Sequence, residues 1–186
     1  MTHCSLSLQM LKKEMDELGR MSVTEFRSSE KFPIFVILDN VRSMHNVGSV
    51  FRTADAFRLQ GILLCGYTPQ PPHRDIQKTA LGATETVEWR HSSSAADVVD
   101  GLKADGYSVW AVEQARGSVA LQDWSPEGSA RIALVFGNEV DGVQQEVMSR
   151  CDGCIEIPQL GTKHSLNVSV AAGIVLWELV RARIEN

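Results

Sequence analysis

The stretch NVGSVFR at residues 46–52 follows the apolar run FVILD at residues 35–39, and together they indicate a buried strand that leads into a helix. Open α/β sheets bind their ligands at the carboxyl ends of the strands, where such turns lie. We therefore expect Asn46, Gly48 and Arg52 at a ligand-binding edge. Asn46 is suited to cap the first N–H groups of the helix, and Gly48 permits close backbone approach. Taken alone, the stretch is also explained by a plain helix cap and a surface arginine.

Two further polar clusters follow apolar runs later in the chain. Residues 137–139 are Gly-Asn-Glu after the run 132–136, and residues 165–167 are Ser-Leu-Asn after the run 155–158. A glycine followed by a carboxylate suits backbone contact with a small ligand, although a tight turn with exposed acids has the same sequence. Ser165 is a natural N-cap for the helix that follows. We expect the three loops to converge on one pocket.

The pattern of apolar residues predicts an α/β fold, with a mostly parallel sheet flanked by helices. Strands are expected at residues 35–39, 61–66, 86–89, 108–113, 132–137 and 155–158. Helices are expected at residues 8–18, 47–57, 94–104, 144–150 and 165–184. The chain is therefore divided into an N-terminal helical extension, residues 1–32, and one α/β domain, residues 33–186.

Composition limits the compartment and the cofactors. The longest late apolar run, residues 170–177, is far shorter than the ~20 residues of a membrane span, and no secretory signal precedes the first helix. We therefore expect a cytoplasmic protein with no membrane partner and with reduced thiols. Cys151 and Cys154 form a CxxC motif, but Cys4 and Cys65 are isolated, so thiols are favoured over zinc and no metal site is expected.

Several common enzyme classes lack their motifs in this sequence. No GxGxxG follows the first strand, and residues 137–144 lack the lysine and hydroxyl residue of a P-loop. No GxSxG nucleophile elbow is present either. Ordinary dinucleotide-binding, P-loop and serine-hydrolase functions are therefore excluded.

The three clusters, in this order and at these separations, resemble the three motifs of the SPOUT superfamily of knotted methyltransferases. The branch they resemble is the TrmH-like family, which methylates ribose 2′-hydroxyls of tRNA or rRNA, and the resemblance covers residues 35–184. It implies S-adenosyl-L-methionine as cofactor, a homodimer and a C-terminal trefoil knot. General rules of chain topology count against knots, so the knot follows from the resemblance alone.

The resemblance also implies roles for individual residues. The catalytic residues would be Asn46, Arg52, Glu139, Ser165 and Asn167. The cofactor would lie against Gly137, Ile157, Leu166, Val112, Glu113 and Gly161. Family proposals make the arginine the base, but a guanidinium with a pKa above ~12 accepts protons poorly. We therefore expect Arg52 to donate to a substrate phosphate or to the developing alkoxide.

The net charge of −5 argues against a nucleic-acid partner unless basic residues gather locally. The candidates for RNA phosphates are Arg42, Arg74, Lys78 and Lys163, with Arg58, His73 and His164 near the same loops. We expect tRNA or rRNA as partner, and no DNA. Two alternatives stay open: a catalytically silent RNA-binding module on the same fold, and a methyltransferase that acts on a base.

Overall fold

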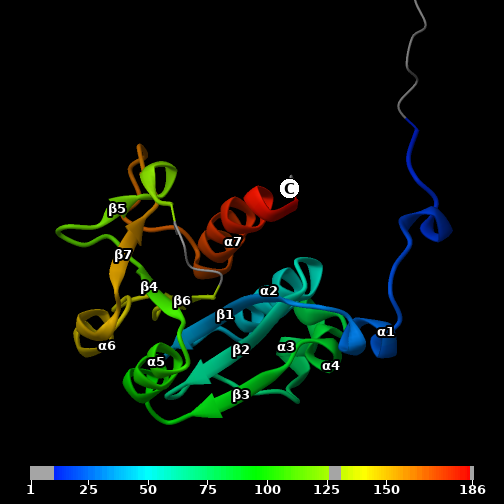
Figure 1. The fold of residues 1–186 in the computed structure, drawn as a ribbon, viewed down its shortest axis with the longest axis horizontal. Helices are drawn as coiled ribbons and strands as arrows, with labels where there is room; N and C mark the ends of the chain where they lie inside the picture. Colours follow the sequence, from blue (N-terminus) through cyan, green and yellow to red (C-terminus); the bar gives the residue numbers. More distant parts are fainter. Residues whose placement is uncertain (1–10, 126–130, 185–186) are drawn as a thin grey trace, which may run out of the picture.

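The computed structural model describes residues 11–125 and 131–184, and a parallel sheet lies at its centre (Figure 1). The sheet has seven strands in the order β3-β2-β1-β6-β4-β7-β5, and every neighbouring pair is parallel. The strands are β1 (Phe32–Asp39), β2 (Leu59–Cys65), β3 (Trp89–Ser92), β4 (Ser108–Val112), β5 (Val119–Ala120), β6 (Ile132–Phe136) and β7 (Gly153–Glu156). The predicted α/β class is confirmed.

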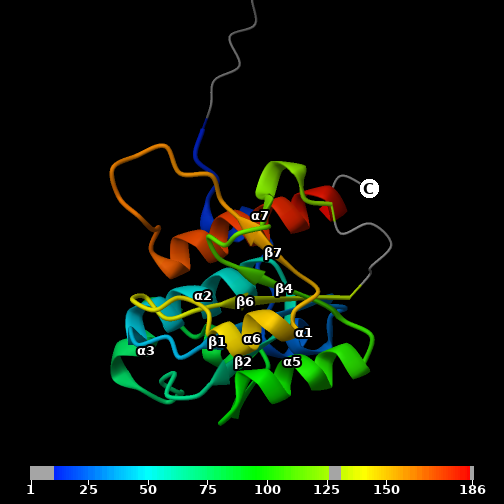
Figure 2. The same ribbon diagram turned by 90° about the vertical axis from the view of Figure 1, so that its left-hand side faces the viewer.

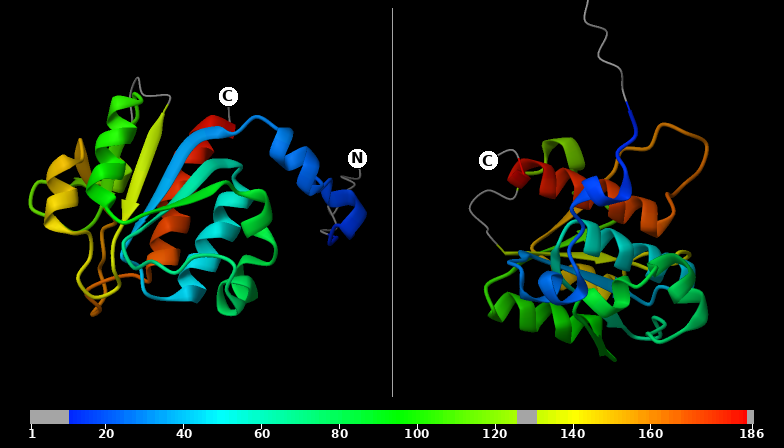
Figure 3. Two further views of the ribbon diagram at one scale, coloured as in Figure 1. Left: turned by 90° about the horizontal axis from the view of Figure 1, so that it is seen from below. Right: turned by 90° about the vertical axis from the view of Figure 1, so that its right-hand side faces the viewer.

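Helices cover both faces of the sheet (Figures 1 and 2). The longer ones are α2 (Met44–Ala56), α5 (Ala95–Ala104) and α7 (Val168–Ile184). The shorter ones are α1 (Val23–Ser28), α3 (Arg74–Ala80), α4 (Ala83–Thr86) and α6 (Gln145–Arg150), with single 3₁₀ turns at Met15–Leu18 and Leu121–Asp123. Seen from below, α2 and α7 lie side by side on one face, and α5 and α6 cover the other (Figure 3). None of the described helices is long and apolar enough to cross a membrane.

Burial on both faces explains the unbroken apolar runs of the central strands. In β1, Val36 and Leu38 pack into the core beneath α2 and α7, whereas Ile37 packs into the core beneath α5 and α6. All five residues of β6 are buried. Parallel sheets covered on both sides have such continuous apolar strands, which is why these two strands could be predicted from composition.

Two predicted elements are wrong. The strand expected at residues 86–89 begins only at Trp89, because residues 83–86 form α4 after Gly82 adopts a left-handed conformation. The helix expected at residues 8–18 is reduced, within the described residues, to the 3₁₀ turn Met15–Leu18, which Gly19 ends at a φ of 55°. Leu11 and Leu18 are exposed there, so no described surface buries an apolar stripe that would hold a longer helix.

Candidate functional site

A cavity of about 980 Å³ opens at the carboxyl edge of the sheet. Its walls come from the ends of β4, β6 and β7 and from the loop that leads into α7, which projects beyond the sheet in Figure 2. Among the described residues that line it, three are acidic (Glu113, Glu139 and Asp141) and none is lysine or arginine. The cavity therefore favours a ligand that carries positive charge.

A chain of side-chain hydrogen bonds joins the three sequence clusters beside this cavity. Asn167 Nδ2 donates to Asn46 Oδ1 at 3.0 Å, and Asn46 Nδ2 donates to Glu139 Oε1 at 2.9 Å. The three residues are 121 and 93 positions apart in sequence, so only the fold brings them together. The expectation that the loops converge is thus met by direct contacts.

The helix caps differ from those predicted, and the difference frees the Asn46 side chain. Ser43, not Asn46, caps α2, because the Ser43 hydroxyl accepts from the Asn46 backbone N–H. Similarly, α7 begins at Val168 and Asn167 acts in place of Ser165, since Asn167 Oδ1 accepts from the Ser169 N–H at 2.9 Å. Ser165 is exposed and lines the cavity instead.

Glu139 clamps the loop after β1 to the loop after β6. Its carboxylate accepts from the backbone N–H groups of Arg42 at 2.9 Å and Ser43 at 3.0 Å, besides Asn46. Burial alone raises the pKa of the Glu139 carboxyl, but these hydrogen bonds outweigh burial, and the pKa lies below its ordinary value of 4.5. Glu139 is therefore ionised at neutral pH and poorly suited to accept a proton.

Asn138 is a site-building residue to which the sequence assigned no role. Its side chain is buried and makes four hydrogen bonds: Nδ2 donates to Asn40 O and to the Tyr67 hydroxyl, both at 2.7 Å. Oδ1 accepts from the N–H groups of Val140 at 2.8 Å and Asp141 at 3.1 Å. An amide has two donor hydrogens and can accept twice, so every bond it needs is made. The sequence signal that could have indicated this role is the position of Asn138 directly after a glycine at the end of a strand.

Glu113 holds a second wall of the cavity. Its carboxylate accepts from the N–H groups of Val143 at 3.1 Å and Gln114 at 2.8 Å. Gly142 sits against it at a φ of 69°, and a Cβ at this position would come within 2.1 Å of Glu113 Oε2. Only glycine adopts this positive φ easily and also leaves room for the Glu113 carboxylate, so any other residue would require the loop to shift.

The predicted site residues divide into those at the cavity and those away from it. Lining residues from the predicted cofactor set are Val112, Glu113, Gly137, Ile157 and Leu166. Gly161 does not line it and lies in the exposed loop before α7. Glu139, Ser165 and Asn167 also line it, and Asn46 bonds to two of these.

Arg52 lies apart from this group. It lies six positions after Asn46, which is about 9 Å along the axis of α2, and it does not line the cavity. Its side chain is exposed, and its guanidinium has no hydrogen-bond or ion-pair partner among the described residues. The guanidinium is thus free to contact an external group.

The basic residues are distributed unevenly around the site. Arg42, Arg74 and Lys163 are exposed, whereas Lys78 forms an ion pair with Asp75 at 2.5 Å. The prediction that Arg58 lies near the loops of the site is wrong. Its carbonyl accepts from Phe32 N at the start of β1, so Arg58 lies at the sheet edge opposite the cavity.

The three described thiols are free cysteines, of which Cys65 is buried and Cys151 and Cys154 are half-buried. Burial raises the pKa of Cys65 and Cys151 to about 12, with the Asp39 and Asp152 carboxylates adding to burial at the two sites respectively. Burial also raises the pKa of Cys154, and Cys4 lies outside the described residues. Thiols so protonated are poor nucleophiles and poor metal ligands. No cluster of three or more potential metal ligands occurs within residues 11–125 and 131–184.

The fold and cavity define an α/β protein with a cavity of ligand-binding size at the carboxyl edge of a parallel sheet. The model of the SpoU rRNA methylase family matches residues 33–177, most of the chain. The chain therefore belongs to the SpoU rRNA methylase family, a family of RNA methyltransferases with SPOUT structures.

Known relatives agree with this assignment. The 23S rRNA (guanosine-2′-O-)-methyltransferase RlmB of Vibrio cholerae is 32% identical over 94% of this chain and 69% of its own length. An AdoMet-bound rRNA methyltransferase from Sinorhizobium meliloti superposes with a TM-score of 0.76 at 30% identity, covering 86% of this chain and 60% of that one. The A. aeolicus TrmH/SpoU tRNA modifying enzyme gives a TM-score of 0.78 at 28% identity, with coverages of 88% and 81%.

Proposed function

We propose that the protein transfers a methyl group from S-adenosyl-L-methionine to a ribose 2′-hydroxyl of tRNA or rRNA. The observation that carries the proposal is the hydrogen-bonded chain Asn167–Asn46–Glu139 beside an acidic cavity, within a member of an RNA methyltransferase family. The relative RlmB is named as a 2′-O-methyltransferase of rRNA, which favours the ribose over a base.

The cavity fits the proposed cofactor in shape and charge. Val112, Ile157 and Leu166 supply apolar surface for an adenine ring, and Glu113 and Glu139 supply negative charge for a sulfonium or an ammonium group. When bound, S-adenosyl-L-methionine supplies an activated methyl group. Gly161, which lies outside the lining, would contact it only after movement of the loop before α7.

In this proposal the residues of the chain position groups and stabilise charge. Glu139, with its lowered pKa, holds the loops after β1 and β6 in register and leaves proton transfer to other groups. Asn46 and Asn167 fix the same wall from α2 and from the start of α7. Arg52, whose guanidinium is free in the described chain, would donate to a substrate phosphate or to the developing alkoxide.

The RNA would lie across the rim of the cavity, where its phosphates meet exposed basic side chains. Arg42 lies in the loop that Glu139 clamps, Arg74 begins α3, and Lys163 lies in the loop before α7. Lys78 would have to exchange its Asp75 partner for a phosphate and is the weakest of the four candidates. Such a rim accounts for RNA binding despite the net charge of −5.

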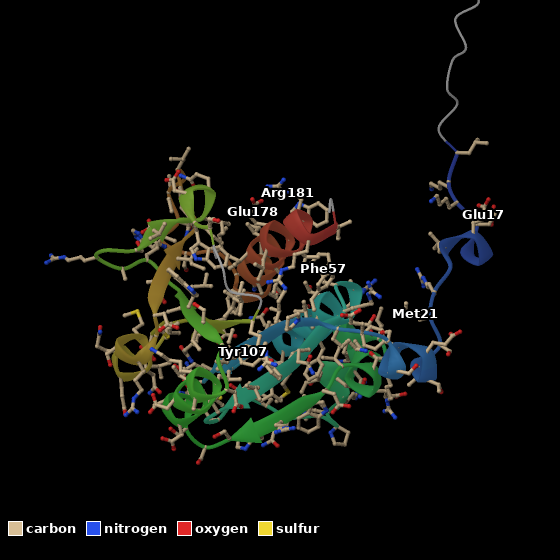
Figure 4. The ribbon with its side chains drawn as sticks, viewed as in Figure 1. Glu17, Met21, Phe57, Tyr107, Glu178 and Arg181 are labelled. Atoms are coloured by element: carbon tan, nitrogen blue, oxygen red, sulfur yellow. The ribbon has the colours of Figure 1, made fainter. Side chains whose placement is uncertain are left out.

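We also propose that the protein is a homodimer that pairs through α7. Val170, Ile174 and Trp177 are exposed by 50%, 39% and 50%, and their spacing places them on one side of the helix. Trp177 extends this apolar surface to α2, because its ring lies 6.0 Å from that of Phe57, which Figure 4 labels between the two helices. The trefoil knot and the division at residue 32 stay predictions.

Nucleoside mass spectrometry tests the proposed function directly. The protein is incubated with methyl-labelled S-adenosyl-L-methionine and with separate tRNA and rRNA pools, and the RNA is then digested to nucleosides. Label in a ribose-methylated nucleoside is the expected result, and the pool that carries it identifies the substrate. Label on a base would support the base-directed alternative. Absence of label in both pools, with RNA binding intact, would support the silent RNA-binding module.

A further inference from the structure

Tyr67 presents an aromatic ring at the surface next to the catalytic loops. Its side chain is 59% exposed, although aromatic rings gain most when buried. It follows β2 at the same carboxyl edge of the sheet as the cavity. Neither the pocket nor the hydrogen-bonded chain of Asn167, Asn46 and Glu139 uses its ring.

The ring is exposed but held in place from both ends. The Tyr67 hydroxyl accepts from Asn138 Nδ2 at 2.7 Å, and the Tyr67 backbone N–H donates to Asn40 Oδ1 at 3.2 Å. Asn138 is itself 6% exposed and precedes Glu139 in the chain. Thus the entropy cost of ordering this side chain is met before any ligand binds.

The surroundings of Tyr67 match a nucleic acid. Thr68 Oγ1 accepts from the Val41 N–H at 3.0 Å, so the segments around Tyr67 and Arg42 lie side by side. Arg42 is exposed, and its guanidinium has no partner within the described residues. A rigid aromatic face beside a free guanidinium is the combination that binds a base together with its phosphate.

We propose that Tyr67 is a stacking platform for an unpaired nucleobase of the RNA substrate, next to the nucleotide whose ribose enters the site. The inference rests on the proposed function. A ribose hydroxyl reaches a cavity at a sheet edge only when its nucleotide leaves the helical stack, and the bases so exposed need a new stacking surface. Tyr67 provides that surface beside the site, because its hydroxyl is hydrogen-bonded to Asn138, the residue that directly precedes Glu139 in the chain.

Paired substitutions separate the ring from its hydroxyl. Tyr67→Ala removes both, whereas Tyr67→Phe keeps the ring and removes only the bond to Asn138. We measure the affinity of each variant for the tRNA and rRNA pools at one salt concentration, and its affinity for S-adenosyl-L-methionine. We expect Tyr67→Ala to weaken RNA binding roughly tenfold to hundredfold with cofactor affinity unchanged, and Tyr67→Phe to retain binding within about threefold.

The other tyrosine of the chain is the matched control. Tyr107, labelled in Figure 4, precedes β4 at the opposite sheet edge and packs on Phe35 at 5.3 Å. Tyr107→Phe and Tyr107→Ala are expected to leave RNA affinity unchanged. If Tyr67→Phe and Tyr67→Ala lose RNA affinity equally, Tyr67 acts only through its hydrogen bond to Asn138 and not by stacking. If Tyr67→Ala binds RNA as tightly as wild type does, the stacking proposal is wrong. If wild type transfers no methyl group to either pool, the proposed function fails, while the binding comparison still decides the role of the ring.

Discussion

Arg52 is the residue whose role the proposed chemistry tests most directly. Because its guanidinium is free in the described chain, Arg52→Ala removes charge without breaking an internal contact. We expect methyl transfer to fall by about a hundredfold or more, as when a donor to a developing oxyanion is lost, with cofactor affinity unchanged. Initial rates with labelled cofactor and calorimetry measure the two quantities. Arg116→Ala, an exposed arginine in the loop after β4, is the control, and a normal rate in Arg52→Ala would exclude Arg52 from catalysis.

Glu139 gives a prediction about pH. A carboxyl whose pKa is lowered by folding stabilises the protein above its unfolded value, and this contribution is lost as the pH falls through the folded value. Glu139→Gln should therefore lower the free energy of unfolding at neutral pH, and the difference from wild type should vanish well below pH 4.5. Urea denaturation at both pH values measures it, with the exposed Glu88→Gln as control. If wild type and Glu139→Gln differ in free energy of unfolding by the same amount at both pH values, the ionised Glu139 carboxylate is not what stabilises the loops.

At the residue scale, the sequence was enough to predict which polar residues belong to the site, but it was not enough to predict which partners they contact. Asn46, Glu139 and Asn167 stood out because amides and a carboxylate follow buried strands. The role of Asn138 depends on partners 98 and 71 residues away, which no local pattern encodes. The distance of Arg52 from the cavity likewise depends on the direction of α2 and on the true start of that helix.

At the element scale, the packing of α2 against α3 depends on Gly48. A Cβ at Gly48 would come within 2.2 Å of Thr79 Oγ1 and 2.3 Å of the Ile76 carbonyl oxygen. Gly48→Ala should therefore force the helices apart and destabilise the fold by about 1–3 kcal/mol. Gly101→Ala in α5 is the control, because its Cβ would meet nothing within 4 Å. There alanine should stabilise the helix by about 0.5–1 kcal/mol, as chemical denaturation can measure.

Elements that are long or buried on both faces were predictable, and short ones were not. Strands β1 and β6 are continuous apolar runs because helices cover both of their faces. Strand β5 has two residues, and α4 has four, so each spans about one period and shows no repeat by which its pattern could be recognised. The expected helix at residues 8–18 had the right periodicity, but the described part packs against nothing that would stabilise it.

At the scale of the whole molecule, the proposed dimer makes α7 its interface. Ile174→Glu places a charge in the middle of the exposed apolar stripe and should convert the dimer to a monomer. Sedimentation velocity measures the change, and Val23→Glu on α1 replaces an equally exposed residue outside the stripe. A monomeric wild type, or an unaffected Ile174→Glu dimer, would contradict pairing through α7.

RNA binding should depend strongly on salt. If Arg42, Arg52, Arg74 and Lys163 each neutralise one phosphate, raising salt from about 50 to about 200 mM should weaken binding roughly 50-fold to 150-fold. Filter binding at several salt concentrations gives the slope, which should become shallower in Arg42→Ala. An affinity independent of salt would argue against a rim that binds phosphates.

The direction of β1 has a practical consequence for handling the protein. The strand starts at Phe32 and ends at the edge that holds the cavity, so the segment 11–22 leaves the body from the far side (Figure 1). A fluorophore or surface tether attached within that segment would keep the cavity mouth facing the solution. The protein could thus be immobilised on a sensor chip with its proposed RNA-binding rim unobstructed.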